Sequence, residues 1–165
     1  MDFQRQTTRR LHQEHDETFD LCARIERTLS ARGRSAPAGG DETWRAFARR
    51  TERELDHAVM RHFEFEEREL FPLLEANSEG AIAQLLLEEH DQIRECAREF
   101  RSLLGLSCET AIEQAQWTRL SALGAELAER LVGHAQKEEM ALLPALDDLL
   151  ADEQDSELFS GYVLD

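Results

Sequence analysis

The sequence predicts an all-α fold: an antiparallel, up-down four-helix bundle made of two pseudo-symmetric helical hairpins. Short breaks divide it into four segments, roughly 5–32, 41–76, 79–104 and 108–150. The segments are rich in Ala, Leu, Glu, Arg and Gln, which favour helix, and poor in β-branched residues. Apolar side chains recur in each at steps of three and four residues, which is typical of helices that pack in a bundle. No segment has the period of two that is typical of a strand.

The breaks between the segments are short and rich in turn-forming residues. The first spans residues 32–40 and holds three glycines and a proline, and Asp41 after it is a good N-cap for the second helix. The second break spans 77–80. The third spans 105–108, and either of its last two residues could lead into the fourth helix. Such short connections indicate that consecutive helices run antiparallel.

Six polar side chains occupy positions where these seams require apolar ones. Each segment contributes one histidine, and the second and fourth segments add a glutamate four residues later, on the same helix face. Because a buried imidazole or carboxylate without a partner is costly, the six need a shared explanation. Imidazoles and carboxylates that converge from four helices indicate a metal site, in which a carboxylate can bridge two ions. The six are His15, His62, Glu66, His90, His134 and Glu138.

An internal repeat relates the two halves of the chain. Residues 62–74 and 134–146 both fit the pattern H-x3-E-E-x2-L-[F/L]-P-x-L. A Glu-His-Asp triplet precedes each copy, centred on His15 and on His90. Each hairpin therefore supplies two histidines and one glutamate. The proline in each copy is expected to kink or end its helix at a matching height.

This duplicated pattern resembles the hemerythrin family, in its divergent bacterial branch of HHE cation-binding domains, over residues 8–150. The resemblance implies a non-haem di-iron centre with two iron ions and an oxo or hydroxo bridge. It also implies that the four histidines are nitrogen ligands and that Glu66 and Glu138 are bridging carboxylates.

The chain departs from the O2-carrying hemerythrins that it resembles. Those proteins have a fifth histidine one turn from the third-helix histidine, and a longer spacing from histidine to aspartate on the fourth helix. Here Leu86 and Arg94 lie one turn from His90, and His134 is followed by Glu138. Two histidines, two bridging carboxylates and a bridging oxygen would leave a position open on each iron. The resemblance therefore implies small-molecule chemistry, without extending reversible O2 carriage to this chain.

Several polar neighbours of these residues have a less direct role. His12 is either an extra ligand or, as we favour, a supporting or surface residue. Glu67 and Glu139 follow the two bridging glutamates and should point about 100° away from the seam, so we favour a supporting or solvated role, and their duplication leaves a hydrogen-bonding role open. Asp16 and Asp91 could orient a histidine of a neighbouring helix through its free ring nitrogen.

Other residues have simpler interpretations. His57 should face away from the metals and form a surface ion pair with Glu54, and Cys22 should be a small core residue. The tail, residues 151–165, is acidic and then apolar, which predicts a mobile terminus, with docking on the bundle or on another subunit as the alternative. Because Tyr162 lies in this tail, no tyrosyl radical beside the metals is expected.

Composition excludes several classes of partner. Nineteen basic and 35 acidic residues give a net charge of −16, which disfavours nucleic acid and anionic membranes. No apolar run approaches the roughly 18 residues of a membrane span, and residues 1–5 do not resemble a secretory signal. The three cysteines form no CxxC pair, so disulfides are not expected. We expect a cytoplasmic bundle over residues 1–150, followed by the tail, in an oligomeric state that the sequence leaves open.

Three functional hypotheses follow. The first is a di-iron protein that binds O2 or a related small oxidant (peroxide or nitric oxide) for sensing, detoxification or oxygen and iron handling. The second is a redox enzyme, either peroxidase-like or a catalyst of iron-centre repair. The third is an iron-sensing interaction module whose fold depends on the metal.

Overall fold

The computed structural model describes residues 3–38, 40–77 and 80–164, and within these ranges the chain forms helices without any strand. The first long segment is α1 (Gln6–Arg32), and the third is α5 (Gly80–Glu109). The second is continuous through α2 (Glu42–Leu55), the π-helical η1 (Asp56–Arg61), α3 (His62–Phe65), the π-helical η2 (Glu66–Leu70) and α4 (Phe71–Ala76). The fourth runs through α6 (Gln114–Lys137), the π-helical η3 (Glu138–Leu142) and α7 (Leu143–Leu149), and α8 (Asp152–Leu164) follows.

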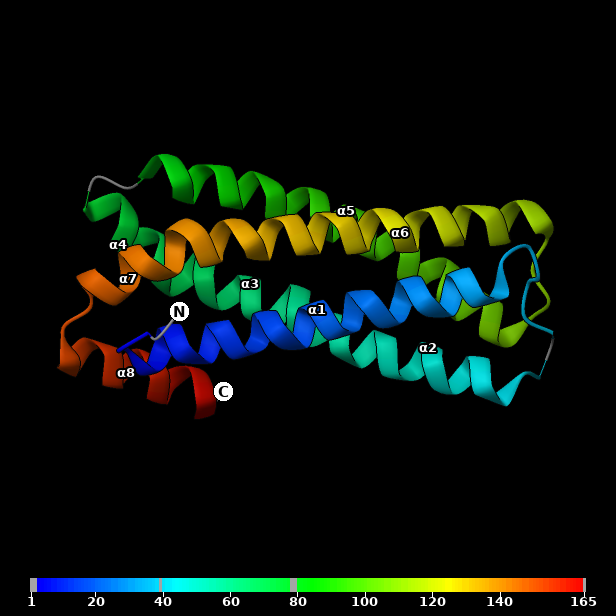
Figure 1. Cartoon of the computed structure of the whole chain (residues 1–165), viewed down its shortest axis with the longest axis horizontal. Coiled ribbons are helices and arrows are strands. Elements are labelled where there is room, and N and C mark those ends of the chain that lie inside the picture. The colour runs from blue at the N-terminus through cyan, green and yellow to red at the C-terminus, as the bar shows by residue number, and fades with distance from the viewer. Residues whose placement is uncertain (1–2, 39, 78–79, 165) are drawn as a thin grey trace.

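The prediction of an all-α bundle is confirmed. Figure 1 shows α1 running from one end of the molecule to the other, the α2–α4 segment returning, α5 running out again and α6–α7 returning. The helix α8 lies beside the first turns of α1. Among the described residues, no helix combines the length and the apolarity needed to cross a membrane.

The first connection lies where the sequence places it. Gly33 ends α1 at φ 55°, and its N–H reaches the carbonyls of Leu29 (3.0 Å) and Ser30 (3.1 Å). Asp41 caps α2, as predicted, because its Oδ1 accepts the Trp44 N–H at 2.9 Å. The predicted break at 77–80 is only partly described, because residues 78 and 79 lie outside the described residues.

The third connection lies later than predicted. The helix α5 continues through 105–108 to Glu109, and α6 begins after Glu113, which forms a capping box with Gln116. Ser107 explains the difference. Its buried hydroxyl donates to the Leu104 carbonyl (2.6 Å) and accepts the Trp44 indole N–H (2.8 Å), so packing against α2 holds this turn in the helix.

The two prolines of the repeat do not end their helices. Each follows a π-helical turn, η2 before Pro72 and η3 before Pro144, and the helix continues as α4 or α7. A proline ring clashes with the carbonyl four residues earlier in a regular α-helix, and a wider turn relieves that clash. Both wide turns begin at a predicted metal-binding glutamate, so the repeat places the same distortion at the same point of the site.

The histidines lie between two apolar clusters. On α1, Leu11 belongs to the cluster at one end of the bundle, Leu21 belongs to the cluster at the other end, and His15 lies between them. The same order recurs on α5, where His90 lies between Leu86 and Ile93. The polar cluster thus interrupts an otherwise apolar core, which fixes its position along the bundle.

Residues 152–164 are helical, so the prediction of a mobile terminus is wrong and docking on the bundle, the alternative, is what the structure has. The carboxylate of Asp155 accepts the backbone N–H groups of Gln6 (2.8 Å) and Thr7 (2.9 Å). Asp147 of α7 accepts those of Gln4 and Arg5. Because the N-cap residue of α1 provides no side-chain cap, Asp155 satisfies the first N–H groups of the helix, while Asp147 holds the two residues that precede it.

Candidate metal centre

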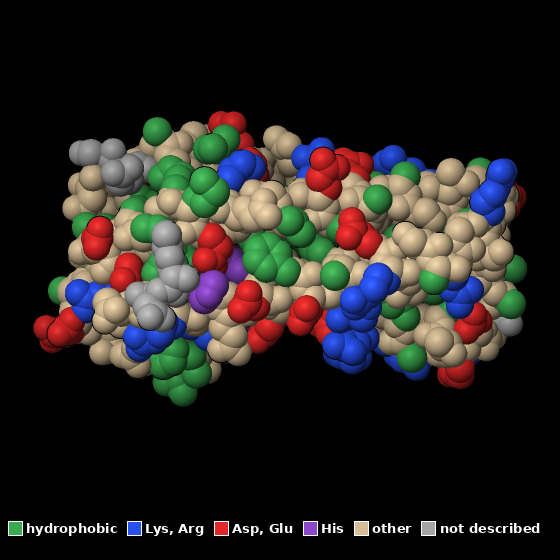
Figure 2. Space-filling view, viewed as in Figure 1, with side chains coloured by type: hydrophobic (Ala, Val, Ile, Leu, Met, Phe, Trp, Pro, Cys, Tyr) green, Lys and Arg blue, Asp and Glu red, His purple; other side chains and the backbone are tan. Residues whose placement is uncertain are grey.

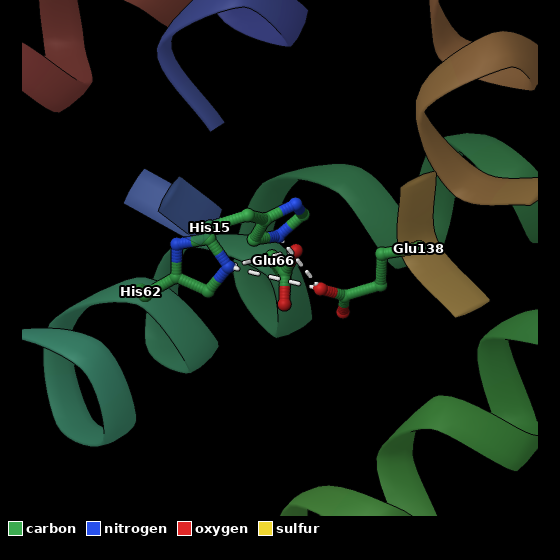
Figure 3. Close-up of side chains that lie close together, drawn as sticks. All are labelled: His15, His62, Glu66 and Glu138. Carbon is green, nitrogen blue, oxygen red and sulfur yellow. Dashed lines mark ion pairs between the residues drawn. The ribbon is translucent and has the colours of Figure 1, made fainter. Parts of the chain in front are cut away.

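The structure brings the six predicted residues together in the middle of the bundle. Each is at most 4% exposed. They form two groups of four, whose potential ligand atoms lie within 4.8 Å of one another. We call His15 and His62 the first half-site, and His90 and His134 the second half-site. Figure 3 shows the first half-site, with both imidazoles directed toward the two glutamates that the half-sites share.

The two glutamates each direct one oxygen to each half-site. Glu66 Oε1 lies 3.3 Å from His62 Nε2, and its Oε2 lies 3.3 Å from His90 Nε2. Glu138 Oε2 lies 2.9 Å from His15 Nε2, and its Oε1 lies 2.8 Å from His134 Nε2. A carboxylate that bridges two metal ions divides its oxygens in this way.

The other nitrogen of each imidazole contacts a carboxylate. His62 Nδ1 lies 2.8 Å from Glu14, and His134 Nδ1 lies 3.0 Å from Glu89. His15 Nδ1 lies 2.7 Å from Glu139, and His90 Nδ1 lies 2.7 Å from Glu67. A carboxylate at Nδ1 favours the tautomer that carries its proton there and leaves the Nε2 lone pair for a metal. All four lone pairs are therefore directed into the shared cluster.

The sequence only partly revealed this supporting layer. The predicted role of Asp16 and Asp91 is wrong, because both side chains are exposed. The first residue of each Glu-His-Asp triplet, Glu14 or Glu89, acts instead and contacts the histidine of the adjacent segment. The duplicated triplet was the available signal, but it did not distinguish the glutamate from the aspartate.

Glu67 and Glu139 do not point away from the site. An offset of about 100° from the neighbouring glutamate directs each side chain to the Nδ1 side of a histidine on another segment rather than to solvent. Each consequently reaches a histidine, and the hydrogen-bonding role that the repeat left open is the observed one. His12 belongs to this layer too, since its Nδ1 contacts Glu139 at 2.8 Å and it is in neither donor group.

A family comparison agrees with this geometry. The model of the hemerythrin HHE cation-binding domain matches residues 6–146. The chain belongs to this family. No curated protein matches the chain significantly. The matched residues of this hemerythrin domain include all six cluster residues and the four supporting glutamates, whereas α8 lies beyond them.

Outside the matched residues, α8 brings Tyr162 beside the supporting layer, so its predicted place in a tail away from the site is wrong. Tyr162 is 6% exposed, and its hydroxyl donates to Glu14 Oε2 at 2.6 Å. Burial raises the pKa of Tyr162, so the phenol keeps its proton. The spacing of Asp155, Leu158, Phe159 and Tyr162 is that of one helix face, and this was the signal that could have revealed a docked helix.

His57 also differs from its predicted place in this hemerythrin domain. Its Nε2 lies 3.3 Å from Glu14 Oε1, so it turns toward the supporting layer. Its predicted partner, Glu54, pairs with Arg50 at 2.7 Å and also with Arg24. Arg10 contacts Glu14 as well, at 2.8 Å. Although burial opposes ionisation, the contacts with His57, His62 and Tyr162 lower the pKa of Glu14 far below its ordinary value.

The donor set of this hemerythrin domain fits a metal ion. Neither oxygen of Glu66 or of Glu138 has a well-directed hydrogen-bond donor within the described part of the chain, although all four oxygens are buried. Burial lowers the pKa of His15, but the nearby carboxylates of Glu138 and Glu139 outweigh it and raise that pKa to about 9. At His90, burial again lowers the pKa, but the carboxylates of Glu138 and Glu66 outweigh it and raise that pKa to about 9. Protons and metal ions therefore compete for the same lone pairs.

Little histidine is visible at the surface. Figure 2 shows only a small patch of histidine atoms, flanked by acidic side chains, on the face of the molecule that it draws. The half-site histidines lie beneath the surface, where Phe63 stacks on His90 with ring centroids 3.6 Å apart, and Phe71 lies 5.4 Å from the same ring. Such an apolar shell limits the access of water to the Nε2 atoms.

Proposed function

We propose that this protein holds two iron ions and binds O2 or a related small oxidant, peroxide or nitric oxide, for sensing, detoxification or oxygen and iron handling. The observation that carries the proposal is the division of the glutamate oxygens. Glu66 and Glu138 each direct one oxygen to each half-site, so two ions would share both carboxylates. Membership of a cation-binding family supports the same conclusion.

Iron is favoured over other metals by the chemistry of the donors. Each half-site offers two imidazole nitrogens and two carboxylate oxygens and contains no thiolate, since neither donor group includes a cysteine. Imidazole and carboxylate donors with room for a further ligand are typical of non-haem iron. The iron would supply a redox-active Lewis acid that can take a small molecule as ligand.

The protein's own residues would prepare the site for that ligand. Glu14, Glu67, Glu89 and Glu139 fix the four imidazole rings through their Nδ1 atoms. Phe63 and Phe71 cover His90 and keep bulk water from the second half-site. Rings that are already oriented need no rearrangement when metal or ligand binds.

Metal analysis combined with absorption spectroscopy tests this function. Protein loaded anaerobically with ferrous iron should contain about two irons per chain, as in other di-iron bundle proteins. Its near-ultraviolet and visible absorption should change on exposure to O2, peroxide or nitric oxide. Zinc-loaded protein is the control, because Zn²⁺ has no redox chemistry and should give no such change. Two bound irons without a spectral response to any of the three ligands would refute the proposal.

A further inference from the structure

The side chain of Tyr162 is linked to a half-site histidine through a single oxygen atom. Its hydroxyl donates to Glu14 Oε2 at 2.6 Å, and the same Oε2 lies 2.8 Å from His62 Nδ1. Tyr162 and Glu14 are both buried. Any movement of the phenol therefore alters the carboxylate that orients His62.

The contacts of α8 hold Tyr162 against this carboxylate. At the start of the helix, Asp155 caps the first turn of α1. Near its end, the Tyr162 ring stacks on Phe65 with centroids 4.0 Å apart, and Arg61 donates to the Tyr162 carbonyl at 2.7 Å. Arg61 and Phe65 flank His62 in the sequence, so α8 is docked on the same turns that carry this histidine.

Like Glu14, which also contacts Arg10 and His57, the other supporting glutamates each have a basic partner, but the phenol contacts Glu14. Glu89 contacts Lys137 at 2.6 Å, Glu67 contacts Arg94 at 2.7 Å and Glu139 contacts His12 at 2.8 Å. These three glutamates are 20–26% exposed, whereas Glu14 is 3% exposed. The buried phenol contact thus distinguishes Glu14 from the other three supporting glutamates. The phenol belongs to α8, which lies outside the residues that the family model matches.

We propose that Tyr162 is a positioning residue for His62, and that docking of α8 and binding of metal at the first half-site stabilise each other. The proposal rests on the di-iron function proposed above. The phenol holds Glu14 in the orientation that directs the Nε2 lone pair of His62 into the site, which raises metal affinity. By linkage, a metal that requires this orientation must stabilise the docked helix by the same free energy. Through this coupling, metal occupancy in the bundle core changes how firmly a surface helix is held.

The substitution Tyr162→Phe tests the coupling while keeping the ring that packs on Phe65. Affinity for ferrous iron would be measured anaerobically by competition with a chromogenic chelator. We expect one of the two iron-binding steps to weaken about tenfold or more, as happens when other residues that support a metal ligand are replaced. Hydrogen–deuterium exchange would follow residues 152–164. In the wild type, iron should slow exchange in α8, and in Tyr162→Phe this slowing should be lost.

Two further variants separate positioning from simple packing. Val163→Ala changes an exposed side chain of the same helix, so it should leave both iron affinity and the iron-dependent exchange unchanged. If Tyr162 acts through Glu14, then Tyr162→Phe should lower the affinity little or not at all in a Glu14→Gln background. Additive losses in this double-mutant cycle would overturn the positioning role.

The failure of this proposal is distinguishable from failure of the proposed function. If the wild type binds about two irons and Tyr162→Phe matches it in affinity and in α8 exchange, the coupling is wrong and the di-iron function stands. If the wild type binds no iron in the chelator assay, the di-iron function fails, and the coupling fails with it before any variant is compared.

Discussion

The two half-sites have the same donors but different surroundings. Both offer two histidines and share two glutamates, and both have a glutamate at each Nδ1 atom. Around the first half-site, however, Glu14 is 3% exposed and accepts the Tyr162 hydroxyl. In the second, the equivalent Glu89 is 21% exposed and pairs with Lys137, which is 48% exposed.

This difference separates what the repeat determines from what it leaves free. The repeat determines the donors, because a change in either copy would disrupt the ions that we propose both copies hold. It leaves the outer partners free, because a carboxylate at a histidine can be satisfied by a phenol, an ammonium group or a guanidinium. Two equivalent ion sites can therefore differ in affinity and in what they are coupled to.

The largest expected effect comes from removing a shared donor. Glu138→Ala should abolish binding of both irons, because this side chain reaches His15 in one half-site and His134 in the other. Iron per chain would be measured by elemental analysis after loading and desalting. Glu64→Ala, at an exposed position on the neighbouring α3, is the control and should retain the wild-type content. A Glu138→Ala protein that keeps one iron in full would show that the half-sites are independent.

The second effect is a pH dependence that the half-sites should share. In iron-depleted protein, the pKa values of His15 and His90 are about 9, above the unfolded value of about 6.5. A group whose pKa is raised by folding stabilises the fold below its unfolded pKa, and this stabilisation is lost as the pH rises through the folded pKa. Raising the pKa of one such group by one pH unit corresponds to about 1.4 kcal/mol of stabilisation.

Thermal unfolding of iron-depleted protein should therefore occur at a lower temperature as the pH rises from about 6.5 to 9. Iron-loaded protein should lack this decline, since the metal displaces the protons. Circular dichroism at a series of pH values measures both. The idea fails if the iron-depleted protein melts at a constant temperature across this range.

The third effect should distinguish the half-sites directly. Glu14→Gln and Glu89→Gln remove the same charge at equivalent positions of the repeat. Both should weaken iron binding, within the range of about 10- to 100-fold seen for such supporting residues. Glu14→Gln should be the more severe, because Glu14 and two of its partners, His62 and Tyr162, are buried away from water, whereas water can replace the partly exposed Glu89 carboxylate.

Chelator competition on the two single variants measures this difference, and the wild type provides the reference. Equal losses would mean that the contacts of α8 do not affect metal affinity. The distinction between a half-site with a buried supporting glutamate and one with a partly exposed supporting glutamate would then be wrong.

The clustering of the six polar residues was predictable, whereas the partners that support them were not, for physical reasons. Six polar side chains in apolar seams stand out because burial makes them costly. The sequence alone therefore predicted that these six residues, among them His15 and Glu66, lie close together. Glu67 was misplaced because an offset of about 100° from Glu66 does not show which atom of a neighbouring histidine the side chain reaches, and here it reaches His90 Nδ1. The π-helical turn before Pro72 was predicted only as a kink or an end.

Tertiary contacts account for the remaining differences between prediction and structure. The third break was placed too early, because the propensity of its residues says nothing about the Ser107 hydrogen bond to Trp44. The tail was expected to be mobile, because its many acidic residues made it look like a solvated terminus, and the helix face that Asp155 and Tyr162 share was overlooked. Both cases depend on a partner that is far away in sequence and that no local pattern encodes.

The smallest effect is expected at the outermost contact of the second half-site. Lys137→Gln removes the ammonium group that lies 2.6 Å from Glu89 but leaves the Glu89 contact with His134. Because Lys137 is half-exposed, solvent screens the pair, and such pairs contribute about 1 kcal/mol or less. Iron affinity should change by no more than about fivefold, and this change should shrink further in high salt.

Tyr162→Phe is the matched change at the first half-site. It should have the larger effect and little dependence on salt, because a buried neutral donor is not screened. A larger, salt-independent loss in Lys137→Gln would instead make the second half-site the more tightly supported of the two.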